Sequence, residues 1–480
     1  MTRLGLILVF AAAVPLPARA QTPEAPLAIV GGTVFPSPNG APIEDGAILI
    51  VDGRIAAVGP RSEVGIPAEA ELVDATGGSV LAGFWNLHVH FVEPVFAGAD
   101  TLPPDVLAEA LREMLLQHGF VHVLDTGSFL ENTLALRERI ESGEVPGPQI
   151  RTAGTPFAAP DGTPFYVRPI EIPALGTPEE AVDSVRVRLG GGADAIKLFT
   201  GSLAALDRPP LLMSPEVVAA TTEAAHAAGA LVLAHPQSVE GARLAALNGV
   251  DLLLHTTPDD PTPWDPELMH AMIERRIHLA PTLKLWAWEL ERAGRPPEVV
   301  RDFQQAGVRQ LADFAQAGGR VVFGTDVGYM ADHDPADEYR LMAEAGLDFP
   351  AILAALTTTP AKLLGEEYAS GVLVAGRAGD LVVVDGRPDR AIEALGEVRL
   401  TVREGRVVYG RAATASAHRC DSDWDGAAVA GLIGVSPLFL AALLSDNVEG
   451  STGWLLLGLV GGIAGFWGGL AIDSARCSRN

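Results

Sequence analysis

The sequence is short of the residues on which several common enzyme classes depend. It has two cysteines, Cys420 and Cys477, and both lie near the C-terminus. Thiol catalysis and thiolate metal sites are therefore excluded from the rest of the chain. No glycine-rich phosphate-binding motif of the Walker or dinucleotide type occurs. The formal net charge of −26 also argues against a nucleic-acid partner, because a phosphate backbone requires a basic surface.

Lysine is equally scarce. The chain has 34 basic residues, and only Lys197, Lys284 and Lys362 are lysines. A lysine can lose its proton and react, whereas an arginine stays charged. A lysine in so arginine-rich a chain therefore hints at a position that arginine could not fill.

Residues 1–20 have the features of a secretory signal peptide. Arg3 gives the positive start, residues 4–14 form a short apolar core, and residues 18–20 (Ala-Arg-Ala) form a small-residue cleavage site. The core is too short to span a membrane. The sequence predicts an exported protein, which would be periplasmic in a bacterium with two membranes.

Segments rich in β-strand signals flank a long central region, at residues 27–80 and 366–412. In the first, apolar runs surround Asp52-Gly53, a dipeptide favoured in tight hairpin turns. The second repeats the pattern at 382–387 and 402–408. We expect both flanks to form one small β-sandwich.

In residues 81–365, short apolar runs alternate with stretches of helical period. One run precedes His88, and the others lie at 120–125, 149–153, 194–199, 230–235, 250–255, 277–282 and 320–325. Eight β/α units of this size predict an α/β fold of the (β/α)8 TIM-barrel type. Catalytic groups of such barrels lie at the C-terminal ends of the strands, so the residues that end each run are the candidates.

Side chains of metal-binding kinds occur at the ends of five of these runs: His88, His90, Lys197, His235, His255 and Asp326. His88 and His90 are two positions apart, so they point to the same face of a strand. Each residue alone has an ordinary structural interpretation, such as a hydrogen-bonded histidine or a helix-capping aspartate. Their convergence on one rim predicts a metal site.

These motifs together resemble the amidohydrolase superfamily, in the branch of imidazolonepropionase-like and Xaa-Pro-dipeptidase-like enzymes. The resemblance covers about residues 27–410, and its most specific parts are the His88-x-His90 pair, Lys197 and the Gly-Thr-Asp that ends at Asp326. It implies two divalent metal ions, usually zinc. The implied ligands are His88, His90 and Asp326 for the more buried ion, His235 and His255 for the second, and Lys197, carboxylated by carbon dioxide, as the bridge.

The implied reaction is hydrolysis of an amide bond in a small substrate, such as a dipeptide or an N-acyl amino acid. Two metal ions can hold a hydroxide that is nucleophilic at neutral pH. Asp326 would pass its proton to the leaving group. If Lys197 is unmodified, a one-metal enzyme is the alternative. Hydrolysis of a cyclic amide or lactone, and a membrane-anchored binding protein without turnover, are two further alternatives.

Loops after the strands supply further candidates for substrate contact: Tyr166, Arg168, Lys284, Tyr329 and His333. A tyrosine hydroxyl can stabilise an oxyanion, and an arginine can hold a substrate carboxylate. Ordinary surface loops explain these residues equally well. Asn86 stands where relatives commonly have aspartate, which affects the orientation of the histidine pair rather than metal binding itself.

Residues 413–480 form a glycine-rich hydrophobic tail. Two uncharged stretches, 427–444 and 454–472, are near the length that spans a bilayer, and the second has glycines at four-residue spacing. This pattern predicts a C-terminal hydrophobic helical hairpin, with membrane attachment through 427–472 and a disulfide between Cys420 and Cys477. A helical pair packed on the barrel or in a homo-oligomer is the alternative, because the charges at the two ends of the hairpin oppose the positive-inside rule.

Overall fold

The computed structural model describes residues 25–258 and 264–411. The predicted signal peptide at 1–20, the tail at 413–480 and its two cysteines lie outside these residues. In the described part of the chain, no helix is long and apolar enough to cross a membrane.

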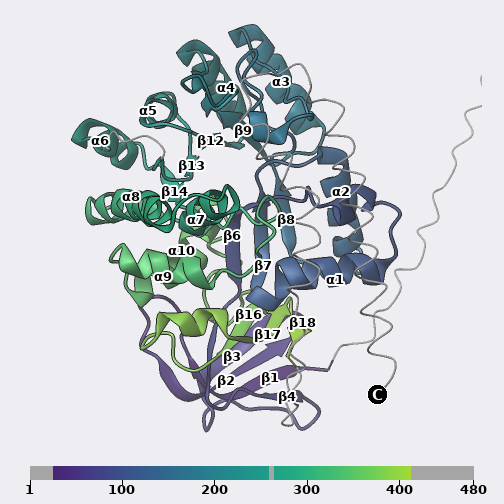
Figure 1. Ribbon diagram of the computed structural model, residues 1–480. Coiled ribbons are helices and arrows are strands. Elements are labelled where there is room, and N and C mark those ends of the chain that lie inside the picture. The colour runs from purple at the N-terminus through teal and green to yellow at the C-terminus, as the bar shows by residue number, and fades with distance from the viewer. Residues whose placement is uncertain (1–24, 259–263, 412–480) are drawn as a thin grey trace, which may run out of the picture. The chain divides into compact units, whose positions relative to one another are not determined.

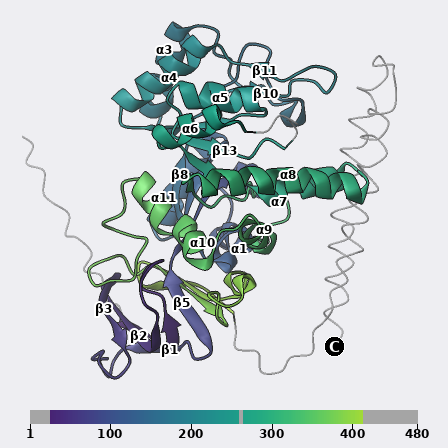
Figure 2. The same cartoon turned by 90° about the vertical axis from the view of Figure 1, so that its left-hand side faces the viewer.

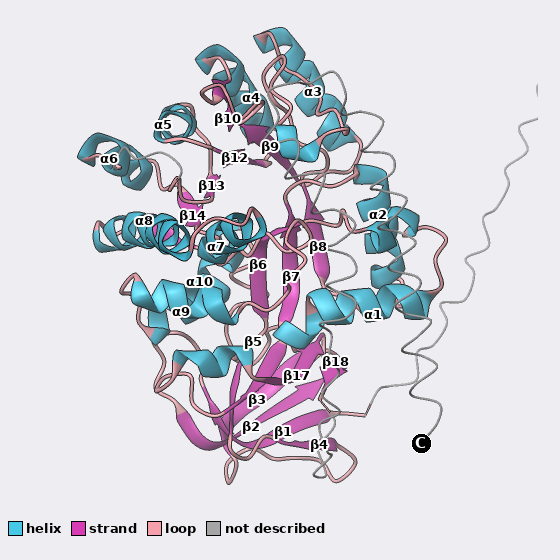
Figure 3. Cartoon of the chain, viewed as in Figure 1, coloured by secondary structure: helices cyan, strands magenta, loops and turns pink. Residues whose placement is uncertain are grey.

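Short parallel strands form the centre of the fold (Figures 1 and 3), and there are eight of them. In chain order they are β6 (Phe84–Val89), β7 (Phe120–Asp125), β8 (Gln149–Thr152), β9 (Ala195–Phe199), β12 (Leu231–His235), β13 (Leu252–Leu254), β14 (His278–Ala280) and β15 (Arg320–Val321). They pair as two sheets, β6-β7-β8 and β9-β12-β13-β14-β15. All of these pairs are parallel, as the alternating sequence pattern predicts.

Hydrogen bonds at both seams join the two sheets. On one side, the backbone N–H of Phe157, just beyond β8, donates to the carbonyl of Lys197 at 2.9 Å. On the other, the Leu87 N–H donates to the Phe323 carbonyl, and the Asp326 N–H donates to the His88 carbonyl, both at 2.8 Å. The strands therefore follow one another around a TIM-barrel-like ring.

Helices between the strands cover the outside of this ring (Figures 1 and 2). They are α1 (Pro104–Met114), α2 (Leu130–Glu141), α3 (Pro178–Gly190), α4 (Pro215–Ala227), α5 (Val239–Leu247), α6 (Pro266–Glu274), α7 (Leu283–Arg292), α8 (Pro297–Gln316), α9 (Ala336–Glu344), α10 (Phe349–Leu356) and α11 (Thr358–Leu363). One large apolar core lies between helices and strands. A second core fills the ring itself, and Ala361 of α11 packs into it.

The two flanks of the chain meet in one eight-stranded sheet. Its strands are β1 (Leu27–Val34), β2 (Ile43–Val51), β3 (Arg54–Pro60), β4 (Glu71–Asp74), β5 (Gly78–Ala82), β16 (Leu381–Asp385), β17 (Val398–Arg403) and β18 (Arg406–Gly410). The turn at Asp52-Gly53 has positive φ at both residues, 48° and 74°, as a type I′ hairpin requires.

This sheet curls around its own apolar core. The Gly379 N–H donates to the Gly53 carbonyl at 2.7 Å, so the segment before β16 meets the edge of β3. Residues from β2, β3, β16 and β17 share one buried cluster. Both layers of the expected sandwich therefore belong to a single folded sheet.

Candidate active site

Five of the six candidate metal ligands lie at or just beyond the C-terminal ends of barrel strands. His88 is near the end of β6 and His90 follows it, His235 ends β12, His255 follows β13, and Asp326 lies beyond β15. The sixth, Lys197, is in the middle of β9. Five of the six are buried, with exposures of 1% for His88, 2% for Lys197, 9% for His235, 3% for His255 and 5% for Asp326. Burying polar side chains is costly unless they have binding partners, so a cluster of five buried titratable residues indicates a functional site.

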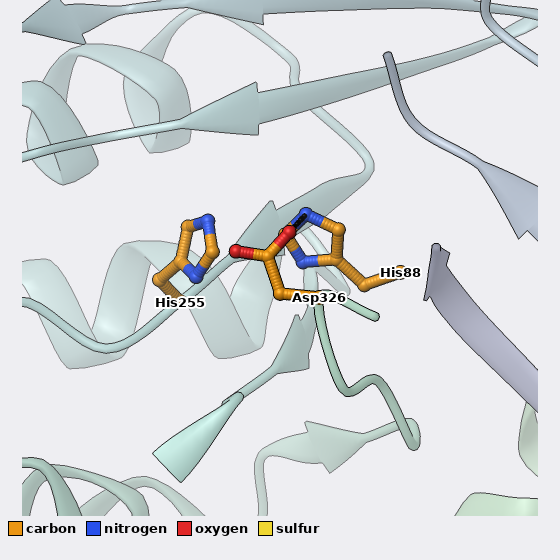
Figure 4. Close-up of side chains that lie close together, drawn as sticks. All are labelled: His88, His255 and Asp326. Atoms are coloured by element: carbon orange, nitrogen blue, oxygen red, sulfur yellow. Dashed lines mark ion pairs between the residues drawn. The ribbon is translucent and has the colours of Figure 1, made fainter. Parts of the chain in front are cut away.

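The carboxylate of Asp326 lies between the imidazoles of the histidine pair. Its Oδ1 is 3.1 Å from Nε2 of His88 and 2.9 Å from Nε2 of His90. Figure 4 shows Asp326 between His88 and His255, and ligand atoms of these three residues all lie within 4.8 Å of one another. One carboxylate oxygen and converging imidazole nitrogens are a donor set that suits a divalent ion such as zinc.

The other candidate ligands, His235 and Lys197, lie next to these three residues around the ring. The ring centroid of His255 is 4.6 Å from that of His88 and 4.7 Å from that of His235. The Nζ of Lys197 lies 5.5 Å from the ring centroid of Phe199, which in turn contacts His235. The six side chains are therefore neighbours in space, although 238 positions separate the first from the last.

Burial shifts these groups toward forms that bind metals. It lowers the pKa of His88 to about 4 and that of His235 to about 3, and it lowers the pKa of Lys197 to about 7. Burial alone would raise the pKa of Asp326, but His88 and His90 outweigh it and hold that pKa well below its usual range. At neutral pH this favours neutral His88 and His235, an ionised Asp326 and a lysine close to losing its proton. His90 differs, because Asp326 outweighs burial and raises its pKa.

Neighbouring groups orient the histidines. Nδ1 of His90 is 2.8 Å from the Gly127 carbonyl, and Nδ1 of His255 is 2.6 Å from the Thr282 hydroxyl. These contacts engage Nδ1 of both rings, so Nε2 is the nitrogen that could bind a metal ion. Nε2 of His235 contacts the Gln237 side chain at 3.1 Å.

Asn86 ties the first strand to the last. Its side-chain Nδ2 donates to the Thr325 hydroxyl at 2.7 Å, and its Oδ1 accepts from the backbone N–H of Thr325 and of His88, both at 3.2 Å. All three residues are buried. Asn86 therefore fixes the position of His88 relative to the segment that carries Asp326.

Several residues around the rim have a backbone that is unusual for their type. Gln237, His255, Thr282 and Asp326 have φ between 47° and 73°, in the left-handed region that residues other than glycine seldom adopt. Such strain persists only where surrounding contacts impose it, and it is common at functional sites. Four of the nine such residues in the described chain lie at this rim.

Asp125 is a site residue that the sequence patterns do not single out. It ends β7 and is fully buried, and its carboxylate accepts hydrogen bonds from Ser128 and Thr152, both at 2.6 Å. The Gly127 N–H also donates to it, at 3.1 Å. Asp125 thereby fixes the loop whose carbonyl orients His90. Its position at a strand end is the one signal in the sequence that could have found it.

Two of the five candidates for substrate contact come together beside Asp326. The rings of Tyr166 and Tyr329 are 5.8 Å apart, and Trp288 lies 6.1 Å from Tyr329. The Tyr329 hydroxyl donates to Glu289 at 2.5 Å. We call Tyr166, Trp288, Tyr329 and Glu289 the rim cluster. Trp288 and Glu289 lie on α7, and no sequence pattern singles them out.

The other three candidates are placed differently. Arg168 is exposed. Lys284 is buried, and its Nζ pairs with Asp332 at 2.8 Å and donates to the Asp334 carbonyl at 2.5 Å. His333 pairs with Glu93 at 2.7 Å. Lys284 and His333 therefore connect loops of the rim to each other.

Replacing Gly328 with alanine is expected to disrupt the site. A Cβ at Gly328 would lie 1.8 Å from the His90 carbonyl oxygen, so the histidine pair or the Asp326 loop must move. Gly346 has nearly the same φ, 93° against 95°, but no atom within 4 Å of its Cβ position. Gly346→Ala should cost about 1 kcal/mol of unfolding free energy, and Gly328→Ala several times more. Equal losses in urea denaturation would contradict this account of the loop.

Comparison with known proteins finds a matching family, a relative by sequence and similar solved structures. A model of the amidohydrolase family matches residues 79–408. Ochratoxinase from Aspergillus niger is 25% identical over 425 residues, which cover 79% of this chain and 85% of the relative. The structure of a Xaa-Pro dipeptidase with bound methionine covers 81% of this chain and 100% of its own, with a TM-score of 0.69 and 24% identity. That of molinate hydrolase covers 82% and 99%, with a TM-score of 0.67 and 24% identity.

Proposed function

Because the chain belongs to the amidohydrolase family and is a hydrolase that acts on amide carbon–nitrogen bonds, we propose that it cleaves a dipeptide or an N-acyl amino acid outside the cytoplasm. The observation that carries this proposal is the convergence of four histidines, Lys197 and Asp326 at one end of the ring. The predicted signal peptide supports export, and the hydrophobic tail supports attachment to a membrane.

We propose that these side chains hold two divalent ions and that both ions are zinc. His88, His90 and Asp326 would hold one ion, and His235 and His255 would hold the other. Bound ions supply Lewis-acid activation of water and of the substrate carbonyl. The chain's own contribution is to fix the ligands through Gly127, Thr282 and Asn86, and to keep Asp326 ionised so that it can accept a proton and return it to the departing amine.

We also propose that Lys197 is carboxylated and bridges the two ions. Carboxylation requires a neutral amine, and burial brings the pKa of Lys197 to about 7. The carboxylates of Asp326 and Asp125 raise this pKa, but they do not outweigh the burial. The carbamate would convert an uncompensated buried cation into an anion with two oxygen ligands.

The rim cluster supports a substrate that has both an apolar group and a hydrogen-bond donor. Three half-buried rings can pack against an apolar side chain. Glu289 can accept from an N–H or an ammonium group. A dipeptide offers both features, and the similarity to a Xaa-Pro dipeptidase agrees with such a substrate. A lactone has neither an N–H nor an ammonium group for Glu289 to bind.

A substrate screen tests this proposal. Purified zinc-loaded protein is assayed against dipeptides and N-acyl amino acids with aromatic, aliphatic and charged side chains, with a lactone set as comparison. We expect hydrolysis of the apolar members and a rise in KM in Tyr329→Phe, which loses the hydroxyl bonded to Glu289. Hydrolysis of lactones alone would contradict the proposed substrate class.

The hydroxyl of Thr282 is expected to set the affinity of the second metal site. Thr282→Val removes the partner of His255 Nδ1 but keeps a β-branched side chain, so we expect metal affinity to fall by about 10- to 100-fold. Thr282→Ser keeps the hydroxyl and should bind nearly as the wild type does. Competition with a chromogenic chelator measures both variants. Equal affinity in Val and Ser variants would show that this contact does not orient the ligand.

A further inference from the structure

A cavity of about 480 Å³ opens at the end of the barrel opposite to the metal ligands. Its walls include Asp251, His278 and Arg320, which lie at the beginnings of β13, β14 and β15. His255 follows Asp251 by four residues on the same strand, which corresponds to about 13 Å. The cavity is therefore separate from the candidate active site, and α11 forms its other side through Thr358, Thr359 and Lys362.

The charge of this cavity is opposite to that of the protein. Four cationic side chains line it: Arg275, Arg276, Arg320 and Lys362. Among the residues that the structure describes, none of these four has an ion-pair partner. The formal net charge of the whole chain is −26, so a cavity lined by four cations without ion-pair partners in the described chain is unusual.

The single acidic residue of the lining does not neutralise these cations. Asp251 already pairs with His226 at 2.9 Å and accepts the backbone N–H of Val232 at 2.7 Å. His278 also lines the cavity, and it is only 7% exposed. Its Nδ1 has no hydrogen-bond partner in the described chain. A buried polar atom without a partner is costly, which indicates that something outside the described chain completes this lining.

We propose that this cavity binds a small molecule through a phosphate group. A phosphate monoester carries nearly two negative charges and three acceptor oxygens at neutral pH. Arginines hold such a group through paired N–H donors, and Lys362 adds a point charge. The hydroxyls of Thr358 and Thr359 can donate to the remaining oxygens. A monocarboxylate would leave most of the four cations uncompensated.

Calorimetric titration of the zinc-loaded full-length protein tests the proposal. The ligands are inorganic phosphate and glycerol 3-phosphate, with acetate, and with sodium chloride at equal ionic strength, as comparisons. The test variant is Arg275→Gln/Arg320→Gln, and the control is Arg309→Gln, an exposed arginine of α8 outside the lining. Thermal unfolding without phosphate shows that both variants are folded.

We expect saturable phosphate binding that Arg309→Gln retains and the double variant loses by at least about tenfold. Vesicles that contain phosphatidic acid form a second arm. Binding of vesicles that the double variant loses identifies a lipid headgroup, and binding of soluble compounds alone identifies a free phosphate ester; both support the site. Absence of saturable binding would overturn the proposal. So would binding that persists in the double variant but disappears with the zinc, because phosphate would then occupy the metal site.

Discussion

Asp326→Asn is expected to lower kcat/KM for amide hydrolysis by about 10⁴-fold while the protein remains folded. An amide has nearly the shape of a carboxylate, but it cannot accept a proton from water and return it to the departing amine. It also lacks the negative charge that Asp326 places between His88 and His90. The loss should therefore appear in kcat, because the rim cluster that would hold the substrate is unchanged.

Steady-state kinetics with the best substrate of the screen measure this effect. Asp337→Asn is the control, since Asp337 is an exposed aspartate of α9 that pairs with Arg340. It should stay within about twofold of the wild type, because exposed ion pairs contribute little. If Asp326→Asn kept a tenth of the activity with its metal content intact, Asp326 would have no part in proton transfer.

Lys197→Met is expected to remove the proposed bridge between the two proposed ions and to abolish activity. Methionine has a similar length and suits a buried position, but it cannot form a carbamate. We expect the metal content to fall from two equivalents per chain toward one or fewer, and activity to fall by about 10³-fold or more. Elemental analysis gives the metal content. Added bicarbonate should raise the activity of the wild type prepared without carbon dioxide, and leave the variant unaffected.

The same substitution should stabilise the metal-free protein at low pH. Folding lowers the pKa of Lys197 from 10.5 to about 7, so the unfolded chain binds more protons than the native chain between these values. The resulting penalty, on the order of a few kcal/mol, is full below pH 7 and disappears as the pH rises toward 10.5. Lys197→Met should therefore raise the unfolding free energy at pH 6, and this gain should shrink by pH 10.

Lys284→Met provides the contrast. Lys284 is also buried, but its Nζ is paired with Asp332 and bonded to the Asp334 carbonyl. Its removal leaves these acceptors without a donor, so the unfolding free energy should fall. If both methionine variants behaved alike in urea denaturation at pH 6, Lys197 would not be the buried amine without an ion pair that the described residues indicate.

The eight barrel strands and the convergence of the six candidate ligands are predictable from the sequence because one rule relates them. Side chains at the ends of parallel strands must share a rim, so His88, His235, His255 and Asp326 are expected to lie together from their positions in the chain alone. The Asp52-Gly53 turn is predictable for a similar reason, since few dipeptides adopt positive φ twice. Membership of the family that the motifs resemble is confirmed.

Contacts that depend on loop conformation cannot be predicted in this way. Nothing in the sequence indicates that Thr282 reaches His255, or that Lys284 pairs with Asp332 instead of facing the substrate. Trp288 and Glu289 resemble ordinary helix residues until α7 is placed beside Tyr329. The cationic cavity joins residues from four segments between 251 and 363, so it exists only in the folded chain.

The most direct measurement of the central claim is metal titration of activity. Chelator-treated protein, verified as metal-free by elemental analysis, is titrated with zinc while hydrolysis of the best dipeptide is followed. Activity should be absent at first, rise with added zinc, and reach its maximum at two equivalents per chain, with no such rise in Asp326→Asn. Undiminished hydrolysis by the metal-free protein would contradict the assignment of these six residues as a catalytic metal site.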